Sequence, residues 1–220
     1  MPDGTTDLPL WAFELDNISG EVNWINQLLN GRELKYTIST LSFTGSSENS
    51  IVISYNPNKP HCLWILTPLD ANYPYLGSYD SQVLALTNLD QVIPEPVNAD
   101  YPDEKIFGSE PEHGWCYFYE KADLARQYSN WGAITELGDQ VLELGYQPGD
   151  TYEWIPFIEG YVHEQKWETA IFLTHNTSVI DSYYRPALCA AWTRSLDGMN
   201  LSPTENELVS ETLSSLDCSR

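Results

Sequence analysis

The sequence has few basic residues: 10 Lys and Arg stand against 32 Asp and Glu, which gives a formal net charge of -22. An electrostatic field of that sign repels phosphate backbones and anionic lipid heads. Nucleic acid is therefore excluded as a favoured partner, and so is direct electrostatic docking to a membrane. A cationic partner, calcium or a simply solvated acidic surface all stay compatible with the charge.

Long apolar runs are also lacking. No window approaches the roughly 18 to 20 apolar residues that a membrane helix needs. The first residues, MPDGTTDLPLW, have neither a basic start nor an apolar stretch, so they do not resemble a secretory signal. Disorder is excluded too, because 42% of the residues are hydrophobic and the chain holds 8 Trp, 14 Tyr and 6 Phe. We expect a folded chain that is either cytosolic or part of a larger protein.

Cysteines are few and widely spaced. The four are Cys62, Cys116, Cys189 and Cys218, and none forms a CxxC pair. This spacing does not match a zinc signature, so we predict no metal site. Buried thiols or up to two disulfides remain, with three possible connectivities.

Motifs that carry catalysis or bind cofactors are absent as well. The sequence contains no GxSxG, GxGxxG or Walker A motif, and its four histidines form no HExxH motif. Carboxylates are frequent, but their proximity in sequence does not establish the fixed separation that glycoside hydrolysis requires. Cys116 lies in the run WCYFY, an apolar setting that raises the pKa of a thiol and disfavours a nucleophile. We predict no catalytic residue and no cofactor in this chain.

The first third of the chain predicts one helix followed by a small sheet. Ser19 is typical of an N-cap, and Gly31 is typical of a helix C-terminus. Alternating or apolar runs at 36–43, 51–55 and 62–66 then predict a three-stranded antiparallel sheet.

A long connection follows, from residue 67 to residue 114. It is rich in proline and acidic residues, and only the stretch SQVLALTNLDQVI has the broad apolar face of two or three helical turns. A connection of this length in a compact chain is either functional or wraps the surface.

Helical spacing of apolar residues continues from Gly114 almost to the end. Pro186 suits the first turn of a helix, and a short last helix follows Pro203. The predicted helices are 115–129, 131–145, 152–165, 167–181 and 186–198.

Two stretches of this helical part are similar to each other. DLARQYSNWGAITELGDQ matches EGYVHEQKWETAIFLTHN when Trp131 is aligned with Trp167, an offset of 36 residues. The second unit resembles a tetratricopeptide repeat, because Trp154, Phe157 and Tyr161 have the W-x2-L-G-x2-Y spacing. The period of 36 and an Ile at the usual small position depart from that pattern. The residues expected to pack the repeats are Phe118, Ala122, Ala125, Trp131, Trp154, Phe157, Tyr161, Trp167 and Ala170.

The order of motifs resembles a more particular family. PHCLWILTP, IFGSEPEHGWCYFYEKADLARQ, WIPFIEGYVHEQKWETA and the terminal Cys in LDCSR are similar to the soluble C-terminal region of bacterial polytopic membrane glycosyltransferase-like proteins, of the dolichyl-phosphate-mannose-dependent mannosyltransferase class. The similarity spans about residues 20 to 220, and GWCYFYEKADLARQ is its most specific part.

This resemblance implies that the chain is a fragment that follows membrane helices and lies on the extracytoplasmic face of a bacterial membrane. The catalytic acids of that class belong to the membrane part, so none is carried over to this chain. In such a location we expect two disulfides, Cys62 with Cys116 and Cys189 with Cys218.

A ligand surface, if present, is expected in segment 70–80. The aromatic residues least constrained by the repeat are Trp64, Tyr73, Tyr75 and Tyr79. Flat rings of this kind stack on sugar faces, and neighbouring carboxylates accept sugar hydroxyls. Core packing remains the competing interpretation for each of these side chains.

We therefore predict an α+β chain with three regions: an N-terminal helix and small sheet with the long connection (1–110), tetratricopeptide-like helical repeats with a capping helix (111–198), and a polar tail (199–220). The expected function is a non-catalytic extracytoplasmic module that binds a protein, peptide or glycan and works with an upstream membrane domain. The alternative is a free-standing cytosolic tetratricopeptide-like interaction scaffold.

Overall fold

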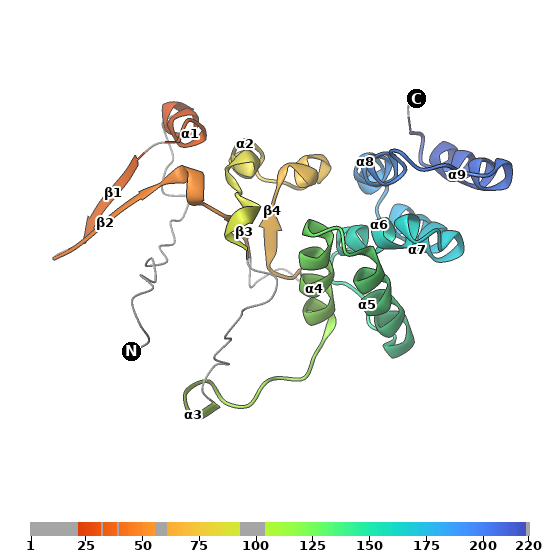
Figure 1. The fold of residues 1–220 in the computed structure, drawn as a ribbon, viewed down its shortest axis with the longest axis horizontal. Coiled ribbons are helices and arrows are strands. Elements are labelled where there is room, and N and C mark those ends of the chain that lie inside the picture. The colour runs from red at the N-terminus through yellow and green to blue at the C-terminus, as the bar shows by residue number, and fades with distance from the viewer. Residues whose placement is uncertain (1–21, 32, 39, 56–60, 93–103, 219–220) are drawn as a thin grey trace. The chain divides into compact units, whose positions relative to one another are not determined.

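The computed structural model describes residues 22–31, 33–38, 40–55, 61–92 and 104–218, and its fold is α+β, as predicted (Figure 1). The chain divides into two compact units, residues 1–48 and 49–220. No helix within these described ranges is long and apolar enough to cross a membrane.

The first unit contains a helix and a hairpin. Helix α1 (Val22–Leu29) is followed by strands β1 (Glu33–Ile38) and β2 (Leu41–Ser46), which pair antiparallel. Gly31 ends the helix with a φ of +74°, a conformation that glycine adopts without steric cost. The predicted N-cap, Ser19, lies outside the described residues.

The predicted three-stranded sheet is wrong. Strands β3 (Val52–Ser54) and β4 (Trp64–Leu66) form a separate two-stranded antiparallel sheet. The reason is that the alternating run at 36–43 reverses direction between Ile38 and Leu41, which are register partners, so that run pairs with itself.

The long connection contains short helical turns on the second unit. Thr67 caps the first of these turns through a capping box with Asp70, and Val83 and Leu84 are buried. The turns are η3 (Pro68–Asn72), α2 (Asp80–Val83), η4 (Leu84–Leu86), η5 (Leu89–Gln91) and α3 (Glu104–Phe107). The helical turns expected in SQVLALTNLDQVI are therefore present, but they are broken into one α-helical and two 3-10 segments.

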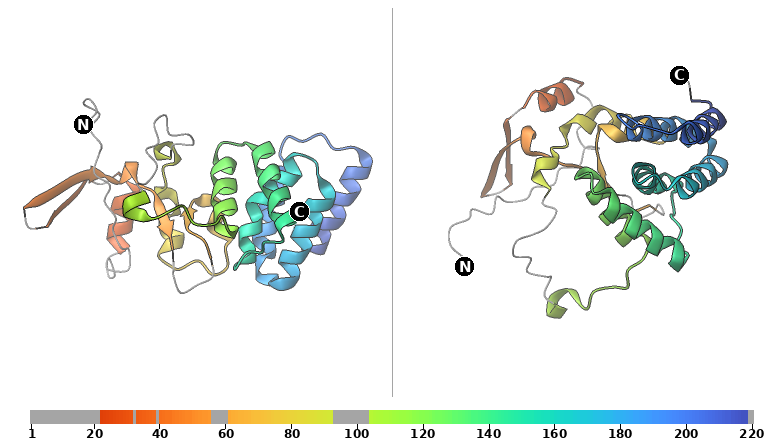
Figure 2. Two further views of the ribbon diagram at one scale, coloured as in Figure 1. Left: turned by 90° about the horizontal axis from the view of Figure 1, so that it is seen from below. Right: turned by 45° about the vertical axis from the view of Figure 1, so that its right-hand side comes forward.

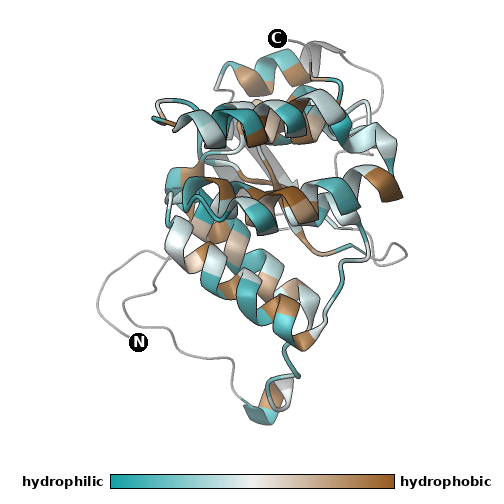
Figure 3. Cartoon of the chain, turned by 90° about the vertical axis from the view of Figure 1, so that its right-hand side faces the viewer, coloured by the Kyte–Doolittle hydropathy of each residue, from teal (hydrophilic) through white to brown (hydrophobic). Residues whose placement is uncertain are grey.

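The remaining helices agree closely with the predicted ranges. Figure 2 shows them following one another as a row of helices coloured from green to blue. They are α4 (Trp115–Gln127), α5 (Trp131–Leu144), η6 (Thr151–Trp154), α6 (Ile155–His163), α7 (Trp167–Ile180), η7 (Ser182–Tyr184), α8 (Arg185–Ser195) and α9 (Pro203–Ser215). Coloured by hydropathy, the same helices carry both brown and teal segments (Figure 3).

The turn between α4 and α5 has the same geometry as the turn between α6 and α7. Asn130 donates its backbone N–H to Ala125 at 2.9 Å, and 36 residues later Lys166 donates to Tyr161 at 2.8 Å. Ser129 and the corresponding Gln165 both have a left-handed φ, of 54° and 56°. One helical hairpin is therefore built twice, each time with a tryptophan as the first residue of its second helix.

Helix α6 is the centre of the second unit and contacts α4, α5, α7 and α8. All of its residues from Ile155 to Val162 are buried. Glycines let α5 and α6 approach closely: a Cβ on Gly160 would lie 2.5 Å from Ile134 Cγ2, and one on Gly138 would lie 2.6 Å from the Tyr161 hydroxyl. At these distances any larger residue would force a neighbouring side chain to shift.

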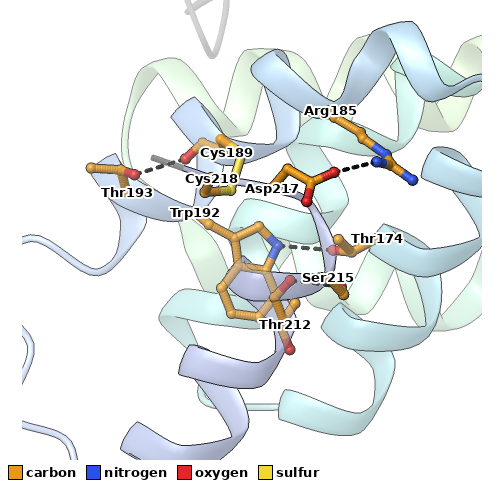
Figure 4. The surroundings of a disulfide bond; sticks show 9 residues. All are labelled: Thr174, Arg185, Cys189, Trp192, Thr193, Thr212, Ser215, Asp217 and Cys218. Carbon is orange, nitrogen blue, oxygen red and sulfur yellow. Dashed lines mark hydrogen bonds and ion pairs between the residues drawn. A yellow bond between two sulfur atoms is a disulfide. The ribbon is translucent and has the colours of Figure 1, made fainter. Parts of the chain in front are cut away.

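The end of the described chain is fastened to α8. A disulfide joins Cys189 in α8 to Cys218, and Arg185 forms an ion pair with Asp217 at 2.6 Å (Figure 4). These links hold the last residues of the described chain beside the start of α8.

The expected region boundary near residue 110 differs from the observed division between residues 48 and 49. A disulfide joins Cys62 to Cys116, and Trp64 donates its indole N–H to Glu153. Residues of the second sheet therefore belong to the same compact unit as the helices.

Candidate functional site

Residues 61–75, here called the strap, run across the starts of α4, α6 and α8. The strap begins at α4, where Cys62 is bonded to Cys116. It continues past the start of α6 and ends where Tyr75 contacts the start of η7. The first helices of three successive helix pairs, α4, α6 and α8, are thereby linked by one short segment.

Glu153 is the first of the carboxylates that hold the strap, and it is fully buried. It accepts hydrogen bonds from the Cys62 N–H at 2.6 Å, the Trp64 indole at 3.0 Å and the Trp115 indole at 2.5 Å. Burial raises the pKa of Glu153, and the three donors act in the opposite direction. Through these hydrogen bonds Glu153 holds the strap in place. The side chain of Glu153 is enclosed by protein.

Asp150 is the second carboxylate, and it joins the strap to two helix starts. It accepts the hydroxyl of Tyr73 at 2.8 Å on one oxygen and that of Tyr184 at 2.7 Å on the other. The same side chain caps η6 by accepting from the Tyr152 N–H. Burial raises the pKa of Tyr73 and of Tyr184, and the nearby Asp150 raises both further.

Asp181 repeats this arrangement one hairpin later. It caps η7 by accepting from the Tyr183 N–H at 2.9 Å, and its other oxygen accepts the Tyr75 hydroxyl at 2.5 Å. The hydrogen bond to Asp181 raises the pKa of Tyr75 to about 12. Each aspartate therefore serves as a cap for its own helix and as an acceptor for a strap tyrosine.

Sequence reasoning missed both aspartates. The signal that identifies them is a repeated triplet, DTY at 150–152 and DSY at 181–183, each close to the start of a helix that the sequence predicts. The strap supplies the matching pair, Tyr73 and Tyr75, two residues apart in the run YPY.

The strap tyrosines belong to a cluster of aromatic rings. Tyr73 is central: its ring centroid lies 4.9 Å from Trp64, 4.7 Å from Tyr152 and 5.8 Å from Tyr75. The cluster extends outward from Tyr75 to Tyr183, with 6.3 Å between centroids and nearly perpendicular planes. Tyr75 and Tyr183 are 50% and 69% exposed, so the cluster ends in two accessible rings at Asp181.

The four predicted ligand residues have different environments. Tyr73 and Tyr75 meet in the cluster, as described. Trp64 also joins it, but its indole is buried and its N–H is bound to Glu153, so it offers no accessible surface. Tyr79 stands before α2, and among the described residues it makes no ring contact with the cluster. Tyr183 was not predicted and is the most exposed ring of the group.

Most of the predicted repeat-packing residues lie in the core. Ala125, Trp131 and Trp167 are only partly buried. Trp131 stacks on His163 with 3.8 Å between ring centroids, and Trp167 donates to Glu205 in α9 at 3.1 Å. The buried ones are Phe118, Ala122, Trp154, Phe157, Tyr161 and Ala170.

A second group of buried charges lies between α4, α6 and α8. Glu159 in α6 is 2% exposed and forms ion pairs with Arg126 at 3.4 Å and with Arg194. Asp123 pairs with Arg126 at 2.7 Å. Burial raises the pKa of Asp123, and the charge of Arg126 lowers it. The two acids and two bases balance one another, as buried charges require.

No group of three or more His, Cys, Asp or Glu side chains is placed to hold a metal ion within the part of the chain that the structure describes. Comparison with family models, with curated proteins and with solved structures finds no match for this chain.

Proposed function

We propose that this chain is a non-catalytic extracytoplasmic module of a membrane glycosyltransferase-like protein, and that it binds a glycan at the edge formed by Tyr75, Asp181 and Tyr183. The single observation that carries the proposal is the pair of exposed rings set nearly perpendicular to each other beside one carboxylate.

The chemistry of this edge suits a sugar. The apolar C–H face of a pyranose packs on a flat aromatic ring, while its hydroxyls need hydrogen-bond partners. Each oxygen of Asp181 accepts one hydrogen bond from the protein, from Tyr183 N–H and from Tyr75. A carboxylate has about four acceptor positions, so capacity remains for sugar hydroxyls.

The two disulfides support a location outside the cytoplasm. They join the pairs that the resemblance led us to expect, Cys62 with Cys116 and Cys189 with Cys218. Disulfides form and persist in oxidising compartments and are rare in the cytosol.

The repeated hairpin supports a tetratricopeptide-like array, which is part of the same proposal. Ala170 is fully buried in α7, nine residues after the buried Tyr161 of α6, as the helix pair of such a repeat requires. The glycine at 160, rather than residue 158, provides the close approach between neighbouring helices.

The glycan proposal is tested by titrating the oxidised, isotope-labelled chain with oligosaccharides of mannose, glucose and N-acetylglucosamine, followed by NMR. We expect shifts centred on the amides of Tyr75, Asp181 and Tyr183. Tyr183→Ala should weaken binding at least tenfold. Tyr128→Ala is the matched control, because Tyr128 is 44% exposed but donates to Val92 elsewhere. Absence of shifts at millimolar sugar, or equal loss in both variants, would overturn the proposal.

The alternative is a cytosolic tetratricopeptide-like scaffold, which the identical turns of the two hairpins favour equally well. The two functions differ in the state of the thiols. Trapping thiols with an alkylating agent during lysis of the native host, followed by mass spectrometry, separates them. Two disulfides support the extracytoplasmic module, and four alkylated cysteines support the scaffold.

A further inference from the structure

Helices α5 and α7 occupy equivalent places in the two copies of the hairpin, so their residues can be compared at an offset of 36. The inward positions agree: Ile134 and Ala170 are both fully buried. Gly138 and Val141 in α5 are likewise buried, as are their counterparts in α7. The two helices therefore pack with the same side toward the row.

Two of the outward positions do not agree in chemistry, although Leu144 in α5 is exposed and apolar like its counterpart Ile180. Where α5 presents Glu136 and Glu143, α7 presents Phe172 and Val179. Phe172 is 56% exposed and Val179 is 67% exposed, and Ile180 beside them is 69% exposed. Seven residues separate Phe172 from Val179, so the two side chains lie on one side of the helix. We call Phe172, Val179 and Ile180 the apolar face of α7.

Acidic helices border this face on both sides. Figure 1 shows α7 between α5 and α9, and side-chain contacts agree with that view. Lys166, just before α7, pairs with Asp139 of α5 at 3.0 Å, and Trp167 of α7 bonds Glu205 of α9 at 3.1 Å. The sequences of α5, α7 and α9 contain no Lys or Arg, and their acidic residues are Glu136, Asp139, Glu143, Glu168, Glu205, Glu207 and Glu211.

We propose that the apolar face of α7 binds a cationic protein segment, a basic amphipathic helix whose apolar side contacts Phe172 and Val179. The contact of such a helix has apolar side chains at its centre and Lys or Arg at its edges, which matches an apolar strip between acidic helices. A second copy of this chain has the same net charge of -22 and is repelled, so it is not the occupant. The face ends at Ile180, the residue before Asp181 of the aromatic edge, but Phe172 and Val179, which carry the proposed contact, are not part of that edge.

The probe is a synthetic helical peptide of leucine and lysine, with all leucines on one side. Binding to the full chain is measured by fluorescence anisotropy, and the contacted amides are mapped by NMR. We expect shifts concentrated on α7 and binding that falls as salt is added. The decisive variant is the double substitution Phe172→Glu and Val179→Glu, which gives α7 the residues that α5 already carries.

This variant separates two explanations, because they predict opposite changes in the affinity for the peptide. It adds two negative charges, so a purely electrostatic attraction to lysine becomes stronger. Docking on the apolar face instead becomes at least tenfold weaker, because the central contacts are lost. Unchanged or tighter binding of the variant would overturn the proposal, and so would shifts spread over all acidic helices.

Two further variants complete the test. Glu136→Phe with Glu143→Val places the apolar face on α5 and should create a second peptide site there. If the glutamate variant of α7 loses its helical circular dichroism, Phe172→Gln with Val179→Gln replaces it, with the same tenfold loss expected. Sedimentation over a range of concentrations tests whether a second copy of the chain binds this face. Self-association that the same substitutions abolish would assign the face to a second copy and contradict the proposal.

Discussion

The hydroxyl of Tyr73 donates to Asp150 at 2.8 Å, although 77 positions separate the two residues in sequence. The other oxygen of Asp150 holds Tyr184 at 2.7 Å, so one carboxylate connects the strap, the start of α6 and the start of α8. The contact is local in space and distant along the chain, and it is one of the contacts that hold the strap.

Substitution Tyr73→Phe should lower the free energy of unfolding by about 1 to 3 kcal/mol, because the ring packing is kept while a partly buried carboxylate loses a donor. Tyr75→Phe removes the same kind of bond at an exposed position and should cost clearly less. Urea denaturation followed by circular dichroism measures both. Equal losses in the two variants would mean that burial of Tyr73 adds nothing to its hydrogen bond.

Alanine substitution at two glycines of α5 should change the stability of the protein in opposite directions. At Gly132 a Cβ meets nothing within 4 Å, so alanine should stabilise the helix by up to about 1 kcal/mol. At Gly138 the new Cβ would lie 2.6 Å from the Tyr161 hydroxyl, which is held by Asp139 at 2.8 Å and cannot move freely. Overpacking of this kind costs about 1 to 3 kcal/mol. Thermal melting of the two variants checks the sign, and stabilisation by both would contradict the close approach of α5 to α6.

Neutralising Glu159 should be far more damaging than neutralising a surface glutamate. In Glu159→Gln the buried Arg126 and the half-buried Arg194 lose their shared acid, and a broken buried pair costs about 3 to 5 kcal/mol. Glu136→Gln, on the exposed side of α5, should change stability by less than about 0.5 kcal/mol.

A double variant tests whether charge balance is the cause. Glu159→Met with Arg194→Met leaves Asp123 and Arg126 as a neutral pair, so it should recover part of the loss seen in the single variant. Chemical denaturation of the three variants gives the comparison. A double variant that is less stable than Glu159→Gln would show that packing, rather than charge, makes Glu159 important.

The phenol of Tyr75 should titrate at a higher pH than an ordinary tyrosine. Its hydrogen bond to Asp181 raises the pKa to about 12, against an ordinary value of about 10. Since the folded pKa exceeds the unfolded one, this stabilisation is fully present below about pH 10 and is lost as the pH rises toward 12. NMR titration of the tyrosine ring carbons measures the value. In Asp181→Asn the pKa of Tyr75 should fall toward its ordinary value while the cap of η7 is kept; an unchanged value would exclude Asp181 as the cause.

Much of the helical part could be predicted from the sequence. The apolar spacing after Gly114, the first-turn prolines at 186 and 203, and the offset of 36 between Trp131 and Trp167 locate the helices and their repeated turn. The strands were harder to predict, because the alternating pattern at 36–43 is the same for one continuous strand and for a hairpin that reverses between Ile38 and Leu41.

The strap and its aspartates could not be predicted, since periodicity shows which residues are buried but not which distant polar groups meet. Two signals were nevertheless present. Glu153 and Glu159 interrupt the apolar run YEWIPFIEGYV, and a carboxylate in such a run needs buried partners. The triplets DTY and DSY mark the two helix starts that accept Tyr73 and Tyr75.

The strap also changes how the row of helices should unfold. A linear stack of repeats whose members touch only their neighbours can melt one repeat at a time from either end. Here one segment is tied to all three pairs of helices: Cys62 to α4, Tyr73 to Asp150 at the start of the second pair, and Tyr75 to Asp181 at the start of the third. Fraying at one end then strains the other, and the second unit should lose its structure in a single cooperative step.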